Sequence, residues 1–180
     1  ENTKPHSIKK KKHFINFGYL MITIVTTRFT NETFIENEEY RLIHQDINCI
    51  YGSPQPMAPA IDPKSPVFVV EMNNSSNSIL GIGLIRNQHV TTRRMIVYSK
   101  GNYNRYVFKG KYRIDLNEIP ADMVEMLNEL LFKGKTHLKR GSGFTTITPK
   151  LLRHPVCNER DLKIEIYNFF KNKYNAISIT

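Results

Sequence analysis

The stretch VFVVEMNNSSNSILGIGLIR, residues 67–86, decides the fold. It opens with six mostly apolar residues rich in valine, which predict a strand over Val67–Met72. The polar run Asn73–Ser78 predicts a turn, and Ile79–Arg86 predicts a second strand. The two strands are therefore expected to pair as a β-hairpin.

The second strand carries Gly81 and Gly83, which lie two positions apart and so point to one face. Two missing side chains on one face allow another element to approach closely, or allow the strand to bend at the corner of a barrel. They do not predict a nucleotide-binding loop, because no third glycine follows and no helix begins after them.

Short strands and a few helices are expected around the hairpin. The further predicted strands are Tyr19–Thr26, Tyr40–Ile43, Met95–Ser99, Arg105–Phe108, Lys111–Asp115 and Phe144–Thr148. The predicted helices are a short one capped by Thr30 or Asn31, one over Pro120–Phe132, and one from Glu159 to Lys173 capped by Asn158. For the first of these, a loop up to Tyr40 is the alternative. Five prolines in Cys49–Pro66 predict a loop there, either functional or a crossover that covers the domain.

This order of elements predicts an α+β fold, with a small, curved, mostly antiparallel sheet or barrel and two to three helices. We expect a basic arm over residues 1–18, a nucleic-acid-binding domain over 19–153, and a C-terminal helix over 154–180 packed on that domain. The chain begins with Glu1 rather than Met, as a piece of a longer protein would.

Composition excludes several classes of protein. Hydrophobic residues make up 40% of the 180 residues and charged residues 23%, which is typical of a globular domain and not of a disordered or fibrous chain. No apolar run is long enough to span a membrane, so we expect no membrane partner. Two cysteines, Cys49 and Cys157, are too few for a disulfide scaffold and indicate a reducing, intracellular location.

The net charge of +10 is unevenly distributed along the chain. Residues 1–12 carry +4, residues 13–85 carry −4 and residues 86–153 carry +9. This polarity favours a polyanionic partner, although a basic surface that only maintains solubility would have the same composition.

Basic and aromatic side chains alternate in the second half of the chain. Cations neutralise phosphates and aromatic faces stack unpaired bases, so this pattern indicates RNA or single-stranded DNA as partner. The candidate binding residues here are Arg93, Arg94, Tyr98, Tyr103, Arg105 and Tyr106. Alternatively, the aromatic residues form the buried face of a strand.

A second candidate is the glycine-rich run GKTHLKRGSGF, residues 134–144. Backbone N–H groups of such a turn can form an anion-binding nest, and flanking cations add charge. Its candidate phosphate-contacting residues are Lys135, His137, Lys139, Arg140, Gly141, Ser142 and Gly143. The spacing is not that of a P-loop, and a solvated basic turn is the alternative.

Evidence for catalysis or metal binding in the sequence is sparse. Glu71 with Asp62 is the one carboxylate pair to consider for a nuclease, and His137 the one histidine for a metal-free phosphodiesterase. The pairs His44–Cys49 and His154–Cys157 would form a zinc site only if they met in space. We therefore assign no catalytic residue, metal or cofactor, and expect a non-enzymatic protein. A nucleic-acid-modifying enzyme and a virion structural protein are the alternatives.

The hairpin, with ILGIGLI followed by a basic residue, resembles the central hairpin of the PUA-like superfamily, which includes the PUA, ASCH, EVE and YTH domains. The resemblance covers about residues 19–115. It implies a compact curved barrel with flanking helices that binds RNA, including modified bases. A YTH-type cage rich in tryptophan is excluded, since the chain has none; a cage would need Tyr51, Tyr98, Tyr103 or Tyr106.

Several segments also resemble blocks from proteins of large DNA viruses, and this resemblance implies other viral proteins as further partners. These segments are CIYGSPQPMAP (49–59), FVVEMNN (68–74), ILGIGLIRN (79–87), NRYVFKGKYRI (104–114) and GKTHLKRGSGFTTIT (134–148).

Overall fold

The computed structural model describes residues 22–175. The predicted basic arm and the first three residues of the strand predicted at Tyr19 lie outside this range, as do residues 176–180. The strands are β1 (Thr23–Phe29), β2 (Cys49–Ser53), β3 (Pro66–Asn73), β4 (Ser78–Arg86), β5 (Tyr106–Gly110), β6 (Tyr112–Asp115) and β7 (Thr145–Thr146). The α-helices are α1 (Asn31–Ile43), α2 (Ala121–Phe132), α3 (Pro149–Leu152) and α4 (Leu162–Tyr174).

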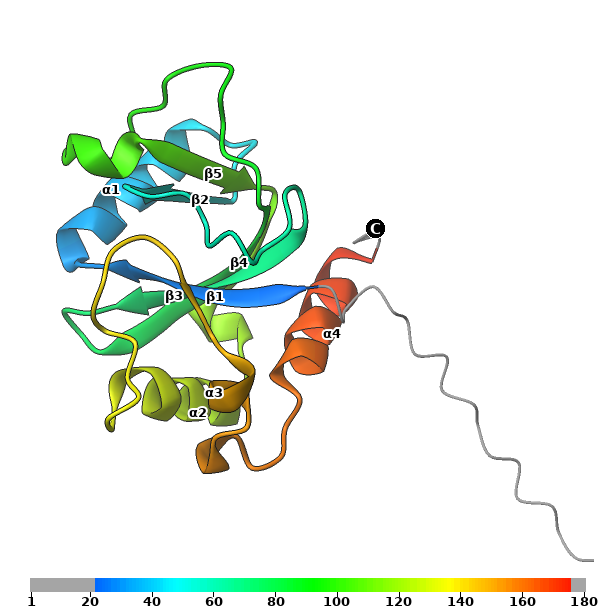
Figure 1. The fold of residues 1–180 in the computed structure, drawn as a ribbon. Helices are drawn as coiled ribbons and strands as arrows, with labels where there is room; N and C mark the ends of the chain where they lie inside the picture. Colours follow the sequence, from blue (N-terminus) through cyan, green and yellow to red (C-terminus); the bar gives the residue numbers. More distant parts are fainter. Residues whose placement is uncertain (1–21, 176–180) are drawn as a thin grey trace, which may run out of the picture.

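Five strands form one sheet in the order β6-β4-β3-β1-β7, and β2 pairs with β5 in a second sheet. Only β1 and β3 run parallel; the other pairs are antiparallel. The small sheet and α1 lie on one side of the large sheet, while α2, α3 and α4 lie on the other (Figure 1). The α+β class is thus confirmed, with open sheets, and residues 22–175 form no closed barrel.

The predicted hairpin is the centre of the large sheet. Strands β3 and β4 pair antiparallel with Val67 opposite Ile85 and Asn73 opposite Ser78. A Cβ atom on Gly83 would lie 2.9 Å from Cζ of Tyr51 on β2, so Gly83 lets the second layer approach closely, while a Cβ atom on Gly81 would lie 2.7 Å from Nη2 of Arg113 on β6. This is the first of the two interpretations of the glycine pair.

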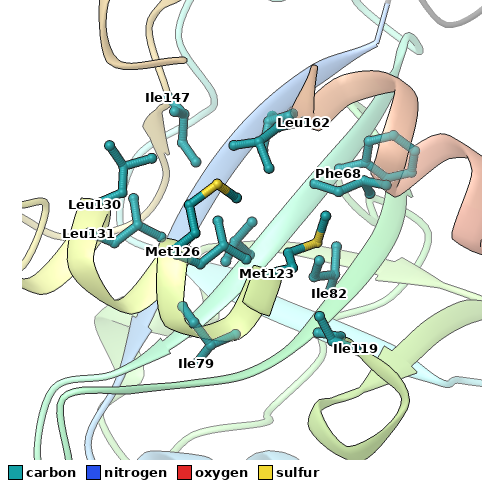
Figure 2. Close-up of a cluster of buried hydrophobic side chains, with 14 of the residues drawn as sticks. Phe68, Ile79, Ile82, Ile119, Met123, Met126, Leu130, Leu131, Ile147 and Leu162 are labelled. Carbon is teal, nitrogen blue, oxygen red and sulfur yellow. The ribbon is translucent and has the colours of Figure 1, made fainter. Parts of the chain in front are cut away.

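Two hydrophobic cores fill the space between the layers. One lies between the large sheet and the helices, where α2 presents methionine and leucine side chains to Phe68, Ile79 and Ile82 (Figure 2). The other lies between the opposite face of the sheet and β2, β5 and α1, and includes Val69, Tyr51 and Phe108. Alternation along β3 supplies both cores, because successive side chains of a strand point to opposite faces.

One strand prediction and part of one loop prediction in the first half of the chain are wrong. Residues Tyr40–Ile43 continue helix α1, whose buried Asn37 donates to the carbonyl of Ile50 at 2.6 Å. Their apolar side chains suggested a strand, yet Leu42 and Ile43 are both more than 70% exposed. In the predicted loop Cys49–Pro66, the first five residues form β2, because its prolines begin only after that strand.

The second half needs two further corrections. Met95–Ser99 is irregular, since the amides of Val97 and Tyr98 donate to the side chain of Asn104 rather than to a neighbouring strand. The last helix begins at Leu162 and not at Glu159. Its cap is Asp161, whereas the predicted cap Asn158 adopts a left-handed conformation with φ of 46°.

Candidate nucleic-acid interface

The glycine-rich run forms an ordered connection between α2 and β7. Arg28, near the end of β1, donates to the carbonyls of Leu138 at 3.0 Å and Gly143 at 2.9 Å, and to Oγ1 of Thr145 at 2.9 Å. Gly141 has a φ of 97° and Gly143 a φ of 69°, conformations that favour glycine. The backbone of this run is therefore held from β1, by a residue that the sequence analysis did not single out.

A small pocket of about 150 Å³ opens beside this run, where β1 ends and α1 begins. Its wall contains three residues from the two segments predicted to bind nucleic acid, namely Tyr98, Tyr103 and Gly141. Arg28 and Lys100 also line it, and no Asp or Glu of residues 22–175 does. The fold thus brings parts of both predicted segments together around two cations.

The electrostatics of the small pocket are dominated by Arg28. Burial lowers the pKa of its guanidinium, but an arginine remains protonated at neutral pH. Its Nε is buried without a hydrogen-bond partner among the described residues, so the charge is only partly compensated. Hydrogen bonding to Thr30, and more weakly the charge of Lys100, lower the pKa of Glu32, an exposed carboxylate outside the pocket.

The two tyrosines of the small pocket have different roles. Tyr98 is only 5% exposed, and its hydroxyl accepts from Asn37 at 2.9 Å. Burial raises its pKa well above the ordinary range, so it is a fixed wall rather than a free stacking surface. Tyr103 is half-buried, with its ring 6.4 Å from that of Tyr98 in an edge-on arrangement. Tyr103 is therefore the ring available for stacking.

The other residues of the aromatic segment do not line the small pocket. Arg93 and Arg94 are exposed on the irregular segment before Tyr98. Arg105 is exposed and its guanidinium lies 5.6 Å from the ring centre of Tyr106, which is half-buried. Cation–π contact therefore occupies one face of Tyr106.

The remaining predicted residues of the glycine-rich run have mixed exposure. Lys135 and Arg140 are exposed, while His137, Lys139 and Ser142 are half-buried. The ring nitrogen Nδ1 of His137 accepts from the amide of Lys139 at 3.3 Å, a contact that stabilises the turn. No carboxylate of residues 22–175 hydrogen-bonds to this histidine.

The carboxylate proposed for a nuclease is occupied by other partners. Glu71 is 1% exposed. Arg113 donates to both of its carboxylate oxygens, with Nη2 2.7 Å from Oε2, and the Tyr51 hydroxyl donates to Oε1 at 2.6 Å. These contacts tie β3, β6 and β2 together, so Glu71 is a structural acid. Within residues 22–175, no group of three or more His, Cys, Asp or Glu is placed to hold a metal ion.

The two predicted half-sites for zinc do not meet. Cys49 lies in the core beneath the small sheet, and Cys157 in the core beneath α2 and α4. Burial raises the pKa of Cys49 to about 12, which keeps its thiol protonated.

Sequence reasoning missed Arg28 and Lys100. The only signal for Arg28 is a single cation near the end of an apolar strand, and Lys100 is one basic residue among many in its segment. Both residues become candidates only because the fold brings the end of β1 close to residues 98–104.

Comparison of the chain with models of known protein families, with curated proteins and with solved structures found no match. No helix within residues 22–175 is both long and apolar enough to cross a membrane.

Proposed function

We propose that this protein binds single-stranded RNA or DNA, without catalysing a reaction on it, through the surface around the small pocket. One observation carries the proposal. Two segments more than 30 residues apart, each chosen for nucleic-acid chemistry, contribute Tyr103 and Gly141 to one pocket that also contains Arg28 and Lys100. Such a site combines a stacking ring with phosphate-neutralising cations.

The dimensions of the pocket favour an unpaired base over a duplex. A volume of about 150 Å³ suits one base, and a base held in a duplex would have to leave its stack to enter. Phosphates on either side of that base would then meet Lys100 and the exposed Arg140. A modified base is compatible with this arrangement, and Tyr103 is the ring it would contact.

Fluorescence anisotropy with a labelled single strand tests the proposal. We expect Lys100→Ala with Arg140→Ala to weaken binding about tenfold and to reduce the slope of log K against log salt by about one to two. The matched control is Lys150→Ala with Lys171→Ala, which removes the same charge from exposed positions outside the small pocket. Equal losses in both variants, or no binding at about 50 mM salt, contradict the proposal.

A second pair of variants tests stacking separately from charge. We expect Tyr103→Phe to retain binding and Tyr103→Ala to weaken it about tenfold or more, because stacking of a base on an aromatic ring is worth about 1–3 kcal/mol. The salt slope should stay the same in both, since no cation is removed. Equal affinity of Tyr103→Ala and the parent would show that no base stacks there.

A further inference from the structure

A second, larger cavity lies at the opposite end of the molecule. Its volume is about 440 Å³, and we call it the large groove. It includes Pro66 at the start of β3, whereas the small pocket includes Asn74 just after β3 ends. The eight residues of β3 span about 25 Å at roughly 3.3 Å per residue, so the two cavities are separate.

The large groove is basic. Arg86, Lys109 and Lys111 line it, and no Asp or Glu of residues 22–175 does. Both lysines are exposed, and neither forms an ion pair with a carboxylate in the described part of the chain. The two lysines, which have no carboxylate partner among residues 22–175, therefore attract and concentrate a multiply charged anion in this concave surface.

The turn that carries the two lysines is held firmly. The backbone amide of Asn48 donates to the carbonyl of Gly110 at 3.0 Å, and its side-chain Nδ2 donates to the carbonyl of Lys111 at 2.6 Å. A Cβ atom on Gly110 would clash with the carbonyl oxygen of Leu84 on β4 and lie 3.2 Å from Cγ2 of Ile85, so this position must be glycine for the two sheets to meet beneath the groove. The two lysines are therefore carried by a turn whose backbone is fixed by hydrogen bonds.

The remaining walls are not those of a simple phosphate site. Leu84 and Ile85 supply apolar surface, and Thr91 and Thr92 hydroxyl groups. Tyr112 also lines the groove, with its ring 4.9 Å from that of Tyr174. The segment that carries the threonines is fixed by the amide of Val90, which donates to the carbonyl of Val107 at 2.8 Å. Apolar and aromatic surface beside cations matches a ligand with a planar ring, hydroxyls and a phosphate.

We propose that the large groove binds a phosphorylated nucleoside, with its phosphate at Lys109 and Lys111 and its base against the apolar surface and Tyr112. The volume lies within the roughly 300–1,000 Å³ typical of small-molecule sites. The ligand is either a free nucleotide or one nucleotide of a longer strand. The proposal does not rest on the function proposed for the small pocket.

The first arm of the test uses a free nucleotide. Isothermal titration with 5′-AMP and 5′-UMP measures binding to the parent, and adenosine and uridine serve as ligands without a phosphate. We expect the nucleotides to bind at least tenfold more tightly than the nucleosides. Lys109→Ala with Lys111→Ala should lower nucleotide affinity tenfold or more, while Lys150→Ala with Lys171→Ala should not. Thermal melting checks that each variant folds.

The second arm uses strands of two lengths. If free nucleotides do not bind, we expect the Lys109→Ala, Lys111→Ala variant to lose fivefold or more affinity for an oligonucleotide of about 24 residues, but not for one of about three, which is too short to span both cavities. That outcome assigns the groove to a strand. The groove has no such function if the double variant matches the parent in both arms. Lys100→Ala with Arg140→Ala should weaken binding of the short oligonucleotide, which Lys109→Ala with Lys111→Ala should not, and this difference separates the proposal from the first.

Discussion

Replacing Gly83 by alanine tests the contact on which the two-layer arrangement depends. The new Cβ would lie 2.9 Å from Cζ of Tyr51 and 3.0 Å from Cβ of Cys49, and nearer still to the Tyr51 hydroxyl oxygen. Tyr51 is fully buried and donates to Glu71 at 2.6 Å. The ring cannot turn into solvent, so it must shift within the core and leave its hydrogen bond.

The magnitude follows from these two effects. Overpacking a well-filled core costs about 1–3 kcal/mol. Loss of a hydrogen bond to a charged group costs about 1.5–3 kcal/mol. We expect Gly83→Ala to lower the free energy of unfolding by about 3–5 kcal/mol, a large share of the roughly 5–15 kcal/mol that stabilises a typical domain.

Urea unfolding followed by circular dichroism measures this loss. Gly101→Ala is the control, because a Cβ at Gly101 meets no atom within 4 Å, and it should change stability by no more than about 0.5 kcal/mol. In a Tyr51→Phe background the clash with the hydroxyl is gone, so Gly83→Ala should cost at least about 1 kcal/mol less. If Gly83→Ala is as stable as Gly101→Ala, or if the two substitutions simply add, the reasoning is refuted.

The hairpin could be predicted because its signals are local. An apolar run rich in valine, a polar turn and a glycine pair all lie within residues 67–86, and the structure confirms the hairpin and the close approach at Gly83. Helix α2 was predictable for the same reason, since its apolar residues follow helical spacing between Pro120 and Gly134.

Elements that depend on distant partners were predicted poorly. Apolar Leu42 and Ile43 suggested a strand, but they are exposed residues in the last turn of helix α1. Asn37 holds that helix against β2 through the carbonyl of Ile50. Met95–Ser99 has strand composition, yet Asn104 takes two of its amides. The composition of a segment indicates whether its side chains can be buried, but it does not indicate which hydrogen-bond partner its backbone has in the fold.

The candidate site was predictable only in part. Basic, aromatic and glycine-rich composition identified Tyr103 and Gly141, but not Arg28. Its hydrogen bonds to the carbonyls of Leu138 and Gly143 position the glycine-rich run from about 110 residues away in the sequence. Glu71 illustrates the converse. In the sequence it was the carboxylate to consider for a nuclease, and it is instead buried and hydrogen-bonded to Tyr51 on β2 and Arg113 on β6, which the sequence does not place beside it.

Three further predictions follow from the same contacts. Tyr174→Phe should lower the free energy of unfolding by about 1 kcal/mol in urea titrations, because its hydroxyl bonds to the backbone of Arg113. Arg28→Ala should accelerate amide hydrogen exchange in residues 134–144 at least tenfold while leaving β3 protected, and Asn74→Ala, which removes one bond to the same run, should have a smaller effect. Stability should fall as pH rises above about 9, because burial raises the pKa of Cys49 from 9.0 to about 12 and the pKa of Tyr51 well above its ordinary value, so these groups ionise first in the unfolded chain. Cys49→Ala and Tyr51→Phe should each flatten the alkaline limb of a plot of unfolding free energy against pH; a limb of unchanged steepness in both variants would mean that other groups cause the loss. The alkaline limb also tests the layered core, since both side chains are fully buried and pack against Gly83 of β4.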